Sequence, residues 1–151
     1  MVALSLSPDA VEWRVCLILA HLRKGEPAAI LTEVQSRPAG FDRDFALAVA
    51  NHALGKPAES DQAVARMISQ YGSTEAFNIA IALTLRGEVD RAFEWLDRAM
   101  AQDDIWLGAL NSDIALGKLR NDPRWQPFLH KLKMNPELLA AIKFDVKLPE
   151  Q

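Results

Sequence analysis

The segment from Ala76 to Met100 limits the possible folds most strongly, because it holds two apolar stripes of helical period on either side of one tight turn. A run of this kind, with polar residues on the opposite side of the second stripe, is typical of amphipathic helices. Gly87 lies between the stripes and tolerates the left-handed backbone that ends one helix before the next begins. The apolar positions are Phe77, Ala80, Ile81 and Leu85, then Val89, Ala92, Phe93, Leu96, Ala99 and Met100. We therefore predict an antiparallel helical hairpin.

Small residues stand where the two helices of this hairpin must approach each other. Ala80 precedes Gly87 by seven residues, Ala92 follows it by five, and Ala99 comes seven residues later. This arrangement resembles the tetratricopeptide repeat, although the family often has tryptophan in place of Ala76 and a helix-ending proline in place of Asp104. The resemblance implies an all-α fold, an α-α superhelix of stacked hairpins, since one such hairpin does not bury its own apolar face.

A second copy lies one repeat length upstream. Gly55 precedes Gly87 by 32 residues (87 − 55), and Ala48 precedes Gly55 by seven. The second helix of this copy looks shifted, so we expect Ala63 and not Ser60 at the small position, after a turn about three residues longer.

A third and weaker copy surrounds Gly25, which precedes Gly55 by 30 residues (55 − 25). Pro27 suits the first turn of a helix, whereas Ile18 and Ile30 stand where the family has small residues. The packing positions predicted over the copies are Ala48, Gly55, Ala63, Ala80, Gly87, Ala92 and Ala99.

These copies predict a single domain of about three hairpins with a helical cap. The expected hairpins cover residues 10–37, 41–71 and 73–102, the cap covers 105–143 and includes a helix that Asp122 and Pro123 begin, and a tail covers 144–151. Residues 105–120 are expected to form short or irregular helical turns, because Gly108, Asn111 and Gly117 interrupt the apolar stripe.

The first residues indicate a part of a larger protein. Residues 3–10 resemble the end of a repeat's second helix, so we expect a C-terminal fragment; a short gene with a disordered first segment is the alternative. Residues 119–134, following the third copy, resemble the C-terminal repeat regions of bacterial signalling proteins of cyclase, kinase and transcription-regulator type.

Composition excludes several other classes. The formal net charge is −3 and basic residues are dispersed among acidic ones, which argues against a nucleic-acid partner. The apolar run from Val15 to Ala20 is too short to cross a bilayer, and the N-terminus lacks the pattern of a signal peptide. A cytoplasmic location is therefore expected, and the single cysteine, Cys16, excludes an internal disulfide.

The resemblance also implies a binding groove lined by the first helix of each hairpin. We expect a non-catalytic interaction module, a scaffold or adaptor, whose apolar groove binds a protein or peptide partner, a second copy, or the chain's own tail around Phe144. The alternative function is that of an intramolecular regulatory or dimerisation domain. For each groove residue, the alternative is a position in the packed core. The groove candidates are Val15, Leu19, Leu22, Phe45, Val49, His52, Phe77, Asn78, Ile81 and Thr84.

The sequence shows few arrangements of residues that are typical of catalytic or metal-binding sites. His21, His52 and His130 fall on separate predicted helices without a carboxylate or thiol at metal-ligand spacing, and Cys16 lies in an apolar stretch typical of a buried thiol. The acidic residues at 42–44 and 103–104 are expected to cap helices or remain solvated. No phosphate-binding loop or nucleophile motif occurs. We therefore predict no catalytic residues, no metal and no cofactor.

Overall fold

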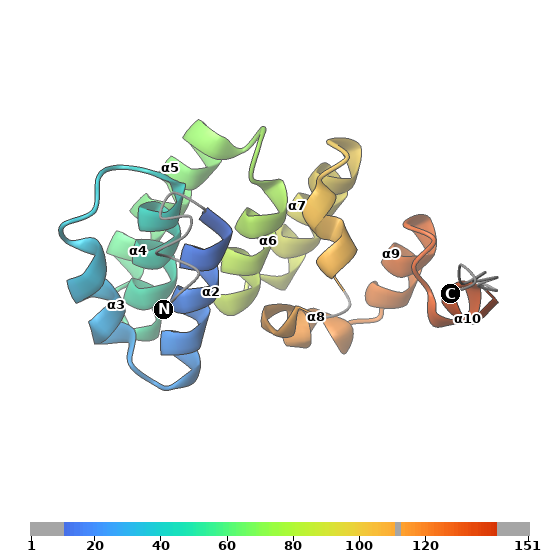
Figure 1. The fold of residues 1–151 in the computed structure, drawn as a ribbon, viewed down its shortest axis with the longest axis horizontal. Coiled ribbons are helices and arrows are strands. Elements are labelled where there is room, and N and C mark those ends of the chain that lie inside the picture. The colour runs from blue at the N-terminus through green and yellow to red at the C-terminus, as the bar shows by residue number, and fades with distance from the viewer. Residues whose placement is uncertain (1–10, 111–112, 142–151) are drawn as a thin grey trace, which may run out of the picture. The chain divides into compact units, whose positions relative to one another are not determined.

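A computed structural model describes residues 11–110 and 113–141, and the predictions for residues 1–10 and 144–151 lie outside this part of the chain (Figure 1). Every regular element in the described residues is a helix, so the all-α prediction is confirmed. None of the helices in these ranges is both long and apolar enough to span a membrane.

The N-terminal part of the structure consists of consecutive helix pairs, which run side by side in Figure 1. Within each pair a turn of three residues joins the helices, and this shortness forces them to be antiparallel. Helix α4 also contacts α2, α3 and α6, so neighbouring pairs share one core. The pairs are α2 (Val11–Arg23) with α3 (Pro27–Val34), α4 (Phe41–Ala53) with α5 (Pro57–Tyr71), and α6 (Ala76–Leu85) with α7 (Val89–Ala101).

The three turns have the same hydrogen bonds and the same backbone hand. Gly25, Gly55 and Gly87 have φ angles of 74°, 71° and 81°, in the left-handed region that glycine adopts without strain. In each turn the glycine amide donates to a carbonyl three residues earlier, and the next amide donates to a carbonyl five residues earlier, as Glu88 does to Leu83 over 2.9 Å. These two bonds form the Schellman motif that closes helices. The turn therefore recurs at the predicted spacings of 30 and 32 residues.

The predicted shift in the second pair is wrong. Helix α5 begins at Pro57, two residues after Gly55, just as α7 begins two residues after Gly87. Ser60 therefore occupies the position of Ala92, and its side chain is fully buried. A serine fits there because its hydroxyl donates a 2.6 Å hydrogen bond to the Ala48 carbonyl oxygen on α4. The turn has no extra residues.

Ser60 also joins one helix pair to the next. The Arg86 guanidinium, which follows α6, donates to the Ser60 hydroxyl and pairs with Asp61 on α5 and Glu88 in its own turn. Burial lowers the pKa of Arg86, but the hydrogen bonds with Asp61 and Glu88 outweigh this effect and raise it above its usual value. The guanidinium thus stays charged while it links α5 to the α6–α7 turn.

The core lies between the paired helices. Five of the predicted packing positions are alanines without exposed surface, whereas the two glycines lie in the exposed turns. Ile18 and Ile30, which take the same positions in the first pair, are equally buried, so that pair encloses larger side chains. The buried alanines are Ala48, Ala63, Ala80, Ala92 and Ala99.

After α7 the chain forms short turns, as predicted for residues 105–120. These are η1 (Ile105–Ala109), η2 (Ile114–Leu116) and α8 (Gly117–Arg120). Helix α7 closes with the same hydrogen bonds as the earlier turns, but Asp103 takes the place of glycine, with a φ angle of 52°.

The structure groups the chain into two compact units, where the sequence predicted one domain. The first unit extends to Lys118 and the second begins at Leu119, inside α8. The second unit contains α9 (Trp125–Lys131) and α10 (Pro136–Ala141). The predicted helix is present but its predicted start is wrong: α9 begins at Trp125, with Arg124 and not Asp122 at its N-cap position. The Asp122 carboxylate accepts the Arg124 amide over 2.9 Å in the turn before the helix. Hydrogen bonds from the Arg124 side chain and amide lower the pKa of Asp122 to about 2.

Candidate functional site

The first unit contains a pocket of about 870 Å³ between α2, the end of α6 and the segment from η1 to α8. Its size falls within the range of ligand-binding clefts. Most of its surface is apolar, and the charged groups are few. The lining residues are Cys16, Leu19, Ala20, Leu22, Arg23, Leu85, Ala109, Asp113, Ile114, Ala115, Gly117 and Lys118.

One wall of the pocket is a stripe along α2. Cys16, Leu19, Ala20 and Arg23 recur at helical spacing and face the pocket. The other side of the helix buries Val15 and Ile18. Helix α2 is therefore apolar on two sides: one is packed in the core, and the other lines the pocket formed by the described residues.

The opposite wall is irregular but firmly anchored. Asp104 caps η1 by accepting the Trp106 amide over 3.0 Å, and its second carboxylate oxygen accepts the Phe77 amide at the start of α6 over 3.1 Å. Asp113 caps η2 in the same way, through the Ala115 amide over 2.8 Å. Because one carboxylate binds both η1 and α6, this wall is tied to the α6–α7 pair.

Two positive charges lie at the pocket. Arg23 and Lys118 line it and are exposed, and neither makes an ion pair with another residue in the described ranges. By contrast, Arg37 and Arg86 in the same unit are paired with carboxylates. Asp113 also lines the pocket, where its carboxylate accepts the Ala115 amide. The pocket thus combines apolar walls with two cations against one carboxylate, a combination that favours an apolar ligand with carboxylates beside its apolar residues.

The structure separates the predicted groove residues into three groups. Leu19 and Leu22 line the pocket, and His52 is exposed elsewhere on the surface. The other seven are buried, so the expectation that they form an open groove is wrong for them. Neighbouring helices cover them: α6, for example, contacts α4, α5 and α7 as well as η2. The buried residues are Val15, Phe45, Val49, Phe77, Asn78, Ile81 and Thr84.

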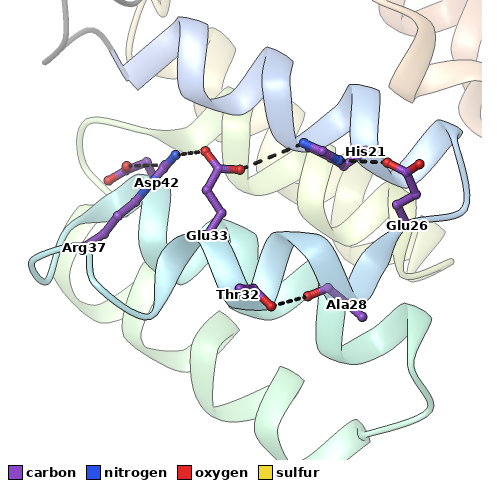
Figure 2. Close-up of polar contacts among 7 residues, drawn as sticks. All are labelled: His21, Glu26, Ala28, Thr32, Glu33, Arg37 and Asp42. Carbon is purple, nitrogen blue, oxygen red and sulfur yellow. Dashed lines mark hydrogen bonds and ion pairs between the residues drawn. The ribbon is translucent and has the colours of Figure 1, made fainter.

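A chain of charged side chains connects α2, α3 and α4 beside this site. In Figure 2, the two ring nitrogens of His21 face Glu26 and Glu33, at 3.1 and 4.0 Å. Arg37 lies between Glu33 and Asp42. Asp42 also binds Arg14 of α2, over 3.1 Å. We call these six residues the α2 charge network, since α2 contributes both Arg14 and His21 to it.

These ion pairs, together with that of Asp44, correct two sequence expectations. Asp42 and Asp44 are buried and paired with arginines, and are not merely solvated; Asp44 binds Arg66 over 2.8 Å. His21 does have carboxylates beside it, because the turn at Gly25 brings α3 back along α2. The sequence separation between His21 and Glu33 concealed this contact.

The pocket offers limited chemistry. Cys16 is exposed at its wall, in contrast to the buried thiol that the sequence predicted. Within residues 11–110 and 113–141, no three His, Cys, Asp or Glu side chains are grouped so as to hold a metal ion. The arrangement suits apolar contact and charge pairing.

Comparisons of the chain with protein-family models, with curated proteins and with solved structures find no match. The functional argument therefore depends on the geometry of the site.

Proposed function

We propose that this chain is a non-catalytic protein-interaction module that holds an apolar segment of a partner in the pocket between α2 and the η1–α8 segment. The observation that carries the proposal is the stripe of Cys16, Leu19 and Ala20, an apolar face of a packed helix that opens into a cavity of about 870 Å³. Apolar surfaces of this kind mark interaction sites when they are rimmed by polar residues.

The repeated architecture supports the same conclusion. Three helix pairs closed by equivalent turns are what the resemblance to tetratricopeptide repeats implies, and proteins of that class present binding surfaces. A wall fixed by Asp104 and a helix fixed by the α2 charge network limit the ordering entropy lost on binding. We place this module in the cytoplasm and assign it a scaffold or adaptor role.

The pocket favours a helical segment whose apolar stripe is flanked by carboxylates. Such a stripe would lie against Leu19 and Ala20, while acidic side chains would pair with Arg23 and Lys118. A designed amphipathic peptide with leucines at helical spacing and glutamates beside them is a direct probe, and the same peptide with lysines is the matched control.

Titration of the fluorescein-labelled peptides, followed by anisotropy, tests the proposal. We expect the glutamate peptide to bind and the lysine peptide to bind at least about tenfold more weakly. Ala20→Glu should abolish binding, whereas Leu54→Glu, which changes an exposed leucine outside the pocket, should not. Equal binding to wild type and Ala20→Glu would overturn the assignment of the pocket.

A further inference from the structure

The chain carries, on its own surface, a segment with the chemistry that the pocket selects. Ile105 and Trp106 of η1 are 83% and 39% exposed, and Ile105 is the most exposed of the large apolar side chains in the described residues. The exposed Asp103 precedes them. One short segment therefore combines two uncovered apolar groups with a carboxylate.

This segment is held in place and not merely left in solvent. Leu107 of η1 is buried, and Asp104 fixes the first turn of η1 through the Trp106 and Phe77 amides. Ile105 and Trp106 are thus presented outward by an ordered turn. A preordered apolar projection loses little entropy on docking.

We propose that a second copy of this chain docks the Asp103–Trp106 segment into the pocket, so that the module forms a homodimer; this inference rests on the proposed function of the pocket. The apolar side chains Ile105 and Trp106 contact the α2 stripe of the other copy. Asp103 pairs with Arg23 or Lys118, which have no ion-pair partner among the residues described within one chain.

The position of η1 in the chain allows this contact to be reciprocal. Ala109, the last residue of η1, lines the pocket, while Ile105 at the other end of η1 is exposed and is not among the lining residues. The docking segment and the receiving pocket are therefore joined by one short helix. A two-fold axis beside η1 then places each segment in the pocket of the other copy, which gives the closed, self-complementary interface of a two-fold dimer.

Sedimentation equilibrium of the full chain, from about 1 μM to 1 mM, measures the dimer directly. We expect wild type to dimerise, and both Ile105→Asp and Ala20→Glu to weaken the dimer at least about tenfold, since each removes one side of the same contact. Leu54→Asp is the control, an exposed leucine outside pocket and segment. Because all three positions are exposed, circular dichroism should show unchanged helicity.

Cross-linking tests the pairing itself. Cys16 is the sole cysteine in the sequence and lies at the pocket wall. Trp106→Cys should give covalent dimers on mild oxidation; Leu54→Cys should not, nor should Trp106→Cys combined with Cys16→Ser. A charge exchange adds specificity: Arg23→Asp and Asp103→Arg should each weaken the dimer, and the double variant should recover part of the loss.

A monomer at every concentration would overturn the inference, as would a dimer that is indifferent to both Ile105→Asp and Ala20→Glu. If that monomer still binds the glutamate peptide, the pocket serves another protein and the proposed function stands alone. If neither the peptide nor a second copy binds, both proposals fail.

Discussion

Helices α2 and α6 hold equivalent places in their pairs but differ in how they are covered. Leu19 and Ile81 each precede the turn glycine by six residues, yet Ile81 is buried and Leu19 lines the pocket. Helix α6 is buried at every position from Ala76 to Thr84, because it contacts both α4 and η2. Helix α2 contacts α3 and α4, and its Cys16, Leu19 and Ala20 line the pocket. The open surface thus arises where one side of a repeated helix faces a pocket and not another packed helix of the described residues.

The two helices also differ in what holds them. Helix α6 is held by apolar burial and by the Asp104 carboxylate at its first turn. Among residues 14–23 of α2, the buried apolar side chains are Val15 and Ile18, and the α2 charge network adds Arg14 and His21 to what holds this helix. Salt screens such pairs where they are exposed, whereas it does not weaken apolar burial.

The sharpest test of the comparison places the same charge at the two equivalent positions. Ile81→Asp leaves an unpaired carboxylate in the core and should lower the free energy of unfolding by about 4 kcal/mol or more. Leu19→Asp should lower it by about 1 kcal/mol, because Leu19 is only half-buried. Urea unfolding measured by circular dichroism compares the two variants. Equal losses would show that α2 is as enclosed as α6.

A smaller effect is expected from removing the carboxylate that anchors α2. Asp42→Ala leaves Arg14 and Arg37 without this shared partner and should cost about 2–3 kcal/mol, since Asp42 is buried. Amide hydrogen exchange should accelerate more in α2 than in α6. Asp61→Ala is the control. The Asp61 side chain, which pairs with Arg86, is 66% exposed, so its removal should cost at most about 0.5 kcal/mol. Uniform acceleration in both helices would contradict a specific role for the network.

The smallest loss of stability is expected from replacing the turn glycines, and it should be the same in the α2–α3 and α6–α7 pairs. Gly25→Ala and Gly87→Ala each force an L side chain into the left-handed region and should each cost about 1–2 kcal/mol. The added methyl group meets nothing within 4 Å at Gly25 and only the Lys118 ammonium, at 3.9 Å, at Gly87. Thermal unfolding should therefore give matching losses. A loss at one glycine only would show that the turns are not energetically equivalent.

The turns were predictable because glycine spacing and helical period are local properties of the sequence. The register of α5 was not, because a serine looks unsuited to a close helix contact until the acceptor at Ala48 is known. That acceptor belongs to the backbone of another helix, so no local pattern reveals it.

The site was predictable only in part. Helix α6 is apolar around its whole circumference, so its sequence does not reveal which of Phe77, Asn78 or Ile81 faces outward; all three are in fact buried. On α2 the pattern did point to Leu19 and Leu22. The far wall was missed because its shape depends on carboxylate caps at Asp104 and Asp113 within irregular turns.

The two hydrogen bonds that the Asp104 carboxylate accepts have a mechanical consequence. Because this one side chain fastens η1 to the start of α6, the irregular wall moves with the α6–α7 pair. The other wall, α2, is held by the buried Val15 and Ile18 together with the ion pairs of Arg14 and His21. We expect added salt to widen the pocket entrance, because it screens the exposed ion pairs of α2 while the η1–α8 wall keeps its position.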